Sequence, residues 1–273
     1  PYSVPGPDFM ACQDCHMPAA AAPGPISSIG GTPIRPAEQR RSHEFIGATP
    51  PQLSDAIGLT LDAWVDGDQL AVQARVSNDG AGHAFPTGVS IRNAVLVIDA
   101  QVDGRSLAQV GGPVVPFYGS ATGGSAPEDL AGRPGRGFAR VLEGRINGSG
   151  PVVAPVLFID AESVQSDTRI PSGGADVSDY RFALDSALVA EAEVTARLVY
   201  RRAWRDLAVT KGWTETPSGD PVETEVQAAS LTVDLTGVVG SVRPVPALST
   251  LALVLMISLL AVAAWASGPS GRR

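Results

Sequence analysis

The hydrophobic pattern of the chain changes near residue 53. Residues 1–52 show weak hydrophobic periodicity and are rich in Pro, Ala and Gly. Beyond them, apolar and polar residues alternate over short runs, and turn-forming residues separate these runs. Alternation with a period of two is typical of strands that have one buried face. The pattern therefore predicts an irregular first segment, 1–52, followed by a β domain, 53–240.

The β domain contains enough short runs for a two-sheet structure. The first two predicted strands, 59–65 and 69–76, are joined by Asp66-Gly67-Asp68, which indicates a hairpin. Further strands are predicted at 94–102, 139–143, 152–158, 179–183, 193–200 and 228–235. A long Gly- and Pro-rich loop is expected at 111–137. Short strands at this spacing, with turns between them, are typical of a β-sandwich.

A different pattern occupies the end of the sequence. Residues 246–266 carry no charge and are mostly apolar, and this length is sufficient for a helix that crosses a bilayer. The terminal pair Arg272-Arg273 would stay on the cytoplasmic side, which places the β domain outside the cytoplasm. A buried core helix is the alternative. The predicted fold is thus mainly β, with an irregular N-terminal segment, a β-sandwich and a single C-terminal transmembrane helix within 241–273.

Composition and charge support this picture and limit the partners. The 273 residues include 30 Gly and 23 Pro, and the net charge is −8. Abundant Gly and Pro suit many short strands joined by turns. The sequence has no basic stripe, so no nucleic acid is expected as a partner. The first residue is Pro and no export signal precedes the cysteines, so we expect a mature form or the C-terminal part of a longer protein.

The strongest chemical signal lies in the irregular segment. Residues 12–16, Cys-Gln-Asp-Cys-His, have the spacing C-x-x-C-H, which is the attachment motif for a c-type haem. The thiols of Cys12 and Cys15 would add to the two vinyl groups of the haem, and His16 would become the proximal iron ligand. A haem would also supply the apolar core that this segment lacks. The predicted cofactor is therefore covalent haem c with its iron.

Other interpretations of the cysteine pair were weighed against haem attachment. A disulfide is one alternative, although C-x-x-C disulfides are usually strained or redox-active. A zinc site would need a second C-x-x-C or a histidine pair. A thioredoxin-like motif would need a βαβ context. The flanking sequence supplies none of these, so haem attachment is favoured.

The chain has three histidines, and each is a candidate iron ligand. A six-coordinate haem needs a second axial ligand besides His16, and imidazole is a common choice. His43 lies in the first segment, on the same side of the domain boundary as the haem motif. His83 lies in a Gly-rich loop after a predicted strand, where glycines allow the backbone to approach a flat ligand. A solvent-facing or hydrogen-bonded histidine is the alternative for both, and Met10 is a weaker candidate ligand.

Four stretches resemble known families. Residues 12–18, C-x-x-C-H-M-P, and residues 41–47 resemble the end of a multihaem cytochrome c of the cytochrome c-554 type. Residues 76–92, V-x-N-x-G-A-G-H-x-x-P-T-G-x-x-x-R, look like the start of the β-sandwich appended to some of these cytochromes. The resemblance implies that His43 is a distal haem ligand, that His83 reaches a haem, and that further haems are carried by preceding sequence. Residues 245–249, V-P-A-L-S, with the apolar run that follows, resemble PEP-CTERM/IPTL-CTERM sorting tails.

Three functions follow as hypotheses. The first is an electron-transfer c-type cytochrome outside the cytoplasm, in which His16 and His43 bind one haem in a low-spin, bis-histidine state. The C-terminal helix holds it to the membrane, and it exchanges electrons with a redox partner protein or other haems. The second is a multihaem oxidoreductase that acts on a small nitrogen or sulfur oxyanion, which would need an open iron position. The third is a structural or docking β-sandwich at the cell surface. Residues 53–240 show no catalytic set, because no histidine remains as a general base after haem assignment, so an electron carrier is favoured over a catalyst.

Overall fold

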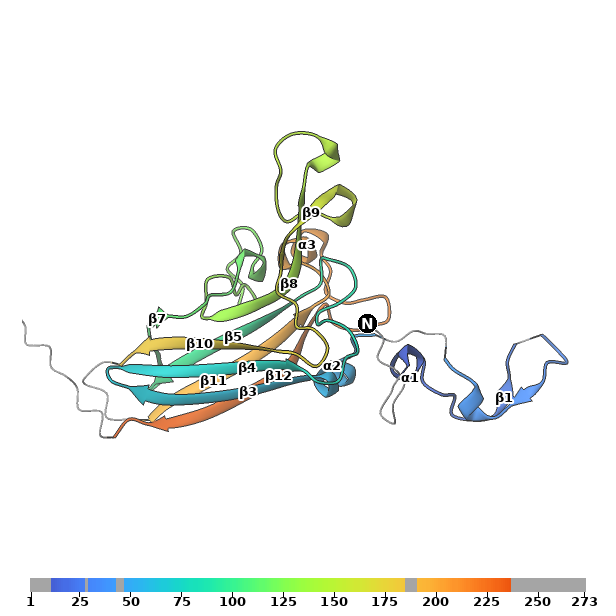
Figure 1. Ribbon diagram of the computed structural model, residues 1–273, viewed down its shortest axis with the longest axis horizontal. Coiled ribbons are helices and arrows are strands. Elements are labelled where there is room, and N and C mark those ends of the chain that lie inside the picture. Colours follow the sequence, from blue (N-terminus) through green and yellow to red (C-terminus); the bar gives the residue numbers. More distant parts are fainter. Residues whose placement is uncertain (1–10, 28, 43–46, 185–190, 237–273) are drawn as a thin grey trace, which may run out of the picture.

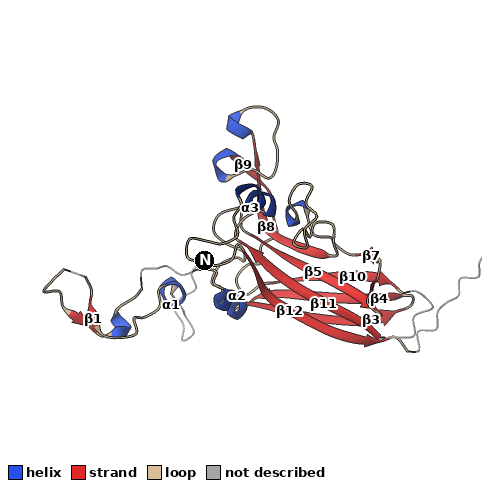
Figure 2. Cartoon of the chain, turned by 180° about the vertical axis from the view of Figure 1, so that it is seen from behind, coloured by secondary structure: helices blue, strands red, loops and turns tan. Residues whose placement is uncertain are grey.

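The computed structural model describes residues 11–27, 29–42, 47–184 and 191–236, and consists of a two-layered β-sandwich with an N-terminal arm at one end (Figure 1). The first sheet has the order β3-β4-β10-β7 and the second has the order β12-β11-β5-β8-β9, with β6 paired to β5. Neighbouring strands in both sheets pair antiparallel. Figure 2 shows the same two layers from behind.

The strands and helices have the following bounds. The first sheet contains β3 (Ile57–Asp66), β4 (Gln69–Asn78), β7 (Gln109–Gly111) and β10 (Ala175–Ala183). The second contains β5 (Asn93–Val102), β6 (Arg105–Ser106), β8 (Gly135–Gly144), β9 (Ala161–Asp167), β11 (Glu191–Arg201) and β12 (Glu223–Asp234). The arm carries α1 (Cys12–His16), β1 (Gly24–Pro25) and β2 (Ile34–Arg35), while α2 (Pro50–Ala56) precedes the sandwich and α3 (Arg205–Lys211) follows β11.

Burial on both faces explains the apolar run of β5. Its even-numbered side chains, such as Leu96 and Ile98, enter the core between the sheets, where they meet residues of β4 and β10. Its odd-numbered side chains, Val95 and Val97, lie under the loop that contains Val115 and Tyr118. A strand covered on both faces loses the alternation that marks a half-exposed strand. The loop at 111–134 is therefore a second cover of the sheet.

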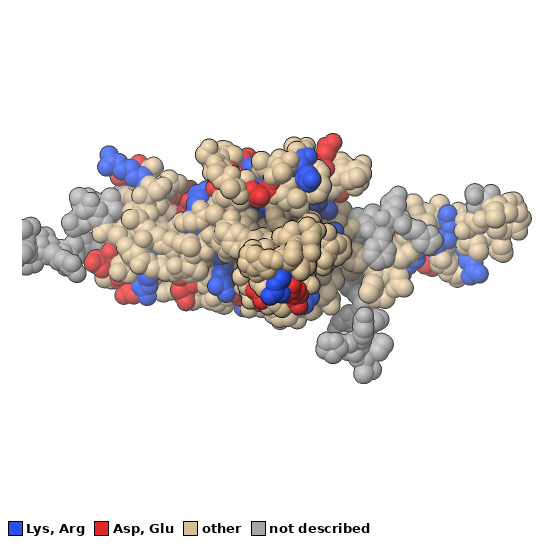
Figure 3. All heavy atoms as spheres, turned by 90° about the horizontal axis from the view of Figure 1, so that it is seen from above, with Lys and Arg blue, Asp and Glu red and all other residues tan. Residues whose placement is uncertain are grey.

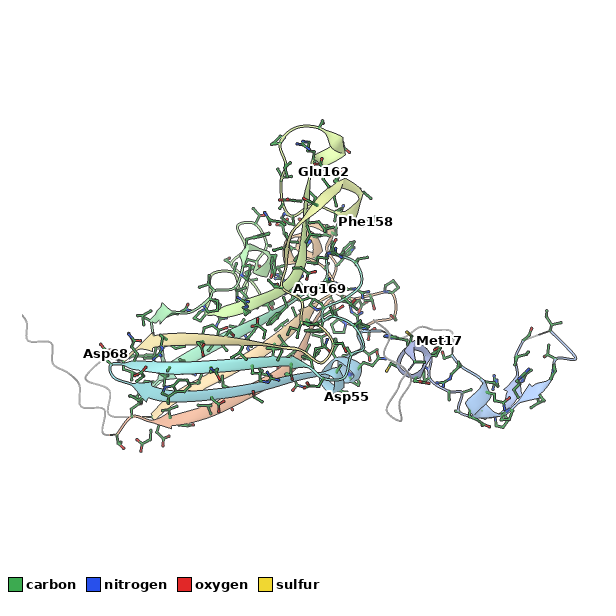
Figure 4. All side chains as sticks on the ribbon, viewed as in Figure 1. Met17, Asp55, Asp68, Phe158, Glu162 and Arg169 are labelled. Atoms are coloured by element: carbon green, nitrogen blue, oxygen red, sulfur yellow. The ribbon has the colours of Figure 1, made fainter. Side chains whose placement is uncertain are left out.

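A hairpin of β8 and β9 projects from the sandwich, and Figure 4 labels Phe158 and Glu162 on it. The seven residues of β9 are exposed, because this strand is the edge of its sheet. In the connection just before β9, Phe158 and Ile159 are 68% and 71% exposed. Elsewhere acidic and basic side chains are interspersed on the face shown in Figure 3.

The mainly β prediction is confirmed, with local corrections. Residues 152–158 do not form the predicted strand: Val153 makes an isolated bridge to Gly144, and a 3-10 helix follows at Phe158–Asp160. The strand β9 was not predicted, because its sequence AESVQSD is polar and exposed throughout. Helix α2 occupies residues at the boundary that was predicted to be irregular.

The predicted fold class is wrong in its last element, the single C-terminal transmembrane helix. Within the described ranges, no helix is long and apolar enough to cross a membrane. The α-helices described are short elements at the ends of the sandwich strands or in the arm, and α2 and α3 have seven residues each. The tail on which the prediction rested, 241–273, lies outside the described residues.

Candidate haem site

Helix α1 presents the C-x-x-C-H motif on one short turn of helix. Both cysteine thiols, of Cys12 and Cys15, are free and exposed. Because residues three apart lie on the same side of a helix, the two thiols share one face. His16 ends the helix and is partly buried. This arrangement leaves both thiols available to one flat ligand.

The side chain of Asp14 stabilises the start of α1 and pairs with Arg41, which lies later in the arm. Its carboxylate accepts a hydrogen bond of 2.8 Å from the backbone N–H of Ala11, before the helix. It also forms an ion pair of 2.7 Å with Arg41. The Ala11 N–H, and after it Arg41, lower the pKa of Asp14. The carboxylate therefore stays charged at neutral pH and caps the helix that carries the cysteines.

The proximal side of the site is fixed to the sandwich by α2. The side-chain Nε2 of Gln52 donates a hydrogen bond of 2.8 Å to the carbonyl oxygen of Cys15. Leu53, the next residue of α2, is 7% exposed and packs into the sandwich core. Figure 4 shows Met17, directly after α1, beside the end of the sandwich that carries Asp55 of α2. The haem motif thus lies against this end of the sandwich.

His83 lies in the loop that follows β4. Asn78, the last residue of β4, donates to the carbonyl oxygens of His83 (2.8 Å) and Ile170 (3.0 Å). Its Oδ1 accepts the backbone N–H of Ala81 at 3.2 Å. Beyond His83, Phe85 and Ile170 exchange two backbone hydrogen bonds of 2.8 Å. The backbone is therefore held on both sides of His83.

The ring of His83 contacts a neighbouring main-chain carbonyl oxygen. Its Nδ1 lies 3.2 Å from the carbonyl oxygen of Ala84. A carbonyl oxygen only accepts hydrogen bonds, so Nδ1 carries the proton in this contact. In the neutral ring, Nε2 then keeps its lone pair, and a hydrogen bond of this kind is what commonly sets the tautomer of a metal-binding histidine. The His83 side chain is exposed, so its Nε2 is accessible.

The rings of His16 and His83 lie opposite one another. Their centroids are 6.2 Å apart and their planes differ by 12°. Ring faces in van der Waals contact would be closer, at about 3.5–4 Å. A metal–imidazole bond is about 2 Å long and a ring nitrogen lies about 1.1 Å from the centroid, so two imidazoles on opposite sides of one ion have centroids about 6 Å apart. The centroid distance is therefore the one that two imidazoles would have if each bound the same metal ion through a ring nitrogen.

The remaining candidates are placed as follows. His43 and Met10 lie outside the described residues. Within the described part of the chain, no group of three or more His, Cys, Asp or Glu side chains is arranged to hold a metal ion. The donor set around α1 is instead two thiols and two imidazoles, which suits a covalently attached haem with two axial histidines.

Sequence reasoning missed two residues that support the site, Asn78 and Gln52. Asn78 stands within the stretch 76–92 that carries the resemblance, and an Asn that ends a strand before a Gly-rich loop is a recognisable loop-stabilising signal. Gln52 carries no such signal, because its partner Cys15 is 37 residues away in the chain.

Comparison with known proteins gives a likeness of fold. The structure is similar to the crystal structure of a penta-heme cytochrome c552 from Thermochromatium tepidum, with a TM-score of 0.53 and 22% sequence identity. The likeness covers 83% of this chain and 48% of that cytochrome, so the chain spans about half of its length. No family model matches the sequence, and no curated protein matches it. The chain therefore has a fold like that of a multihaem cytochrome.

Proposed function

We propose that this chain is an electron-transfer unit of a c-type cytochrome, with one haem attached to Cys12 and Cys15 and held between His16 and His83. The observation that carries the proposal is the 6.2 Å separation of the two nearly parallel imidazole rings beside a free cysteine pair. The bound haem would supply a one-electron iron couple. With His16 and His83 both binding the iron, no iron position would be left for a substrate, so the site would pass electrons without bond chemistry.

The protein would hold the two histidine ligands in fixed positions. Asp14 caps the helix that carries the thiols, and Gln52 joins that helix to α2. Asn78 holds the backbone of the distal ligand. These contacts restrict the movement of both axial ligands, and such restriction favours rapid electron transfer because little rearrangement accompanies a change of charge.

Further haems on preceding sequence, and a place outside the cytoplasm, belong to the same proposal. The similar structure is that of a penta-heme protein, and this chain spans 48% of it. Haem attachment to C-x-x-C-H takes place outside the cytoplasm, which implies a periplasmic or extracellular location. The electron partner is then either another haem or a redox protein in that compartment. His43 is a candidate ligand of such a neighbouring haem.

The test is to produce the chain with a haem-attachment system and to compare the wild type with His83→Ala and His43→Ala. We expect covalent haem by intact mass and a low-spin spectrum in the wild type. His83→Ala should become high-spin and bind carbon monoxide readily, whereas His43→Ala should stay low-spin.

Each contrary outcome has its own meaning. Absence of covalent haem would overturn the proposal. A high-spin wild type that binds small ligands would favour an oxidoreductase. If His43→Ala became high-spin while His83→Ala stayed low-spin, the second iron ligand would be His43 in place of His83. The electron-transfer function would not be affected by that result.

A further inference from the structure

We infer that Asn78 is a positioning residue that sets how firmly His83 is held at the iron; this inference rests on the proposed function. Asn78 is fully buried, with 0% of its surface exposed, although it lies at the end of a strand. A buried amide persists where its hydrogen bonds are satisfied. Here its two donors and its acceptor bond the carbonyl oxygens of His83 and Ile170 and the N–H of Ala81.

The contact with His83 is direct, because Asn78 binds the carbonyl oxygen of the ligand residue itself. The imidazole of His83 is exposed, so core packing does not restrain it. Its backbone is restrained by Asn78 on one side and by the Phe85–Ile170 pair on the other. Removing the amide would free the first of these restraints while the second remains.

Asn78 also lies beside the end of α2, the helix whose Gln52 binds α1. It is the register partner of Ile57, which directly follows α2. The N–H groups of Asp79 and Gly80 both donate to the carbonyl oxygen of Ala56, the last residue of α2, at 3.0 Å. Gly80 is so close to α2 that a Cβ at this position would lie 2.8 Å from Cα of Ala56.

Both axial histidines are therefore attached to one rigid corner. Gln52 of α2 holds the proximal helix through Cys15, and Asn78 holds the distal loop through His83. It follows that the spacing between His16 and His83 is controlled by the sandwich as well as by the haem. In this arrangement the β domain has a direct part in the redox site.

A purely structural role for Asn78 has a matched comparison in the same sandwich. Asn93 of β5 is also 0% exposed and also donates from its amide to two backbone carbonyl oxygens, of Ile91 and Ala203, at 3.2 Å each. Neither partner belongs to the haem site. Replacement of either asparagine leaves two carbonyl oxygens without their amide donor, so both changes should lower stability.

The experiment compares Asn78→Ala with Asn93→Ala in the haem-loaded chain. Carbon monoxide binds reduced iron only when His83 has left it, so the apparent binding reports the population of the open site. We expect Asn78→Ala to raise this population roughly tenfold and to add a high-spin fraction to the spectrum. Asn93→Ala should lower the melting temperature yet keep the wild-type rate of carbon monoxide binding.

Free imidazole provides a readout that a loss of stability would not produce. Imidazole should return Asn78→Ala to a low-spin spectrum, because it replaces the displaced ligand, and should leave the wild type unchanged. Should Asn78→Ala fail to fold, Asn78→Asp serves in its place, since it keeps the acceptor for Ala81 and removes both donors.

The outcomes separate this inference from the proposed function. If the wild type is low-spin and the Asn78 variants bind carbon monoxide as slowly as it does, the inference is overturned and electron transfer stands. Equal acceleration in Asn93→Ala would also overturn it, because the effect would then be one of general stability. A wild type without covalent haem would overturn the proposed function itself.

Discussion

The side chain of Gln52 donates a hydrogen bond of 2.8 Å to the main-chain oxygen of Cys15, and so connects the sandwich to the helix that carries the haem motif. Gln52 occupies the first turn of α2, and its Oε1 accepts the hydroxyl of Thr49 at 3.1 Å. Leu53 packs in the core and fixes α2 to the sandwich. The hydrogen bond from Gln52 therefore restricts the movement of α1 relative to the sandwich. The arm is thereby held at one defined point.

Replacing Gln52 with Met should loosen α1 without unfolding the sandwich. Loss of the hydrogen bond to Cys15, together with the one from the Thr49 hydroxyl, is expected to speed hydrogen–deuterium exchange of the amides of residues 12–17 roughly fivefold. The matched control is Gln73→Met. It removes a hydrogen bond of the same 2.8 Å length, which the side-chain amide of Gln73 donates to the carboxylate of Asp179 on the sheet. Equal exchange in both variants would show that Gln52 does not hold the helix.

Arg201 should be among the most costly positions of the sandwich to replace. Its side chain is fully buried, and its guanidinium donates to the carbonyl oxygens of Gly119 (2.9 Å) and Glu128 (2.6 Å) and lies 3.3 Å from the carboxylate of Glu223. Burial lowers the pKa of Arg201, and Glu223 opposes this. Arg201→Met leaves buried partners unpaired, so we expect a loss of about 3–5 kcal/mol in the free energy of unfolding by urea.

The control for this change lies on the same strand. Arg197 pairs with Glu225 at 3.8 Å on the surface, and its side chain is 43% exposed. Arg197→Met should cost less than about 1 kcal/mol, because exposed ion pairs contribute little. Similar losses in the two variants would contradict the importance of the buried network.

Asp129 should make the stability of the sandwich depend on acid pH. Its carboxylate is 5% exposed and accepts the N–H groups of Ala121 and Ala126 at 2.9 Å each, while Arg205 lies 3.2 Å away. The N–H of Ala121, and then those of Ala126 and Arg205, lower the pKa of Asp129. A carboxyl group whose pKa is lower in the folded state stabilises the fold above its unfolded pKa of about 3.9, and this stabilisation is lost as the pH falls through the folded pKa.

The measurement compares the wild type with Asp129→Asn by urea unfolding at several pH values. The variant should be less stable at pH 7, and the difference should shrink below about pH 4 as the wild-type carboxyl group becomes protonated. Asp62→Asn, at an exposed position of β3, is the control for the substitution itself and should change stability at pH 7 by less than about 0.5 kcal/mol. A difference that stays constant down to pH 2 would contradict the prediction.

Replacement by Ala should lower the stability strongly at one glycine and hardly change it at another. At Gly135 of β8, a Cβ would collide with the backbone oxygen of Leu96 and lie 2.6 Å from Cγ2 of Val115. Because backbone atoms of a central strand cannot move aside easily, Gly135→Ala should cost at least about 2 kcal/mol. At Gly82, no described atom lies within 4 Å of the added Cβ, so Gly82→Ala should change stability by less than about 0.5 kcal/mol. Thermal unfolding of both variants tests the contrast.

The strands that the sequence predicted well are those with clear alternation. The predicted hairpin of 59–65 and 69–76 is found as β3 and β4, because one face of each strand enters the core. The run 152–158 was mistaken for a strand since it is apolar, but several of its side chains, including Val152 and Phe158, are exposed on the projecting hairpin. An apolar run forms a buried strand only where other parts of the fold pack over it. That packing depends on distant residues, so the run itself does not predict it.

The sequence by itself determined the chemistry of the candidate site and the class of the fold. The spacing of Cys12, Cys15 and His16 lies within one turn of chain, so local geometry is sufficient to bring the three groups together. Alternation of side chains likewise depends only on the backbone of one strand, and this is why the β class was predictable.

Only the tertiary structure brings His83 beside His16, and His43 lies outside the described residues. His83 and His16 come from segments far apart in the chain, and their 6.2 Å separation depends on the pairing of β3 with β4, on α2 and on the bonds made by Asn78 and Gln52. No local pattern encodes such contacts, because they arise when sheet pairing and core packing bring distant residues together. The transmembrane helix was predicted from the uncharged run 246–266, the terminal arginines and a resemblance to sorting tails, and no described element supports it.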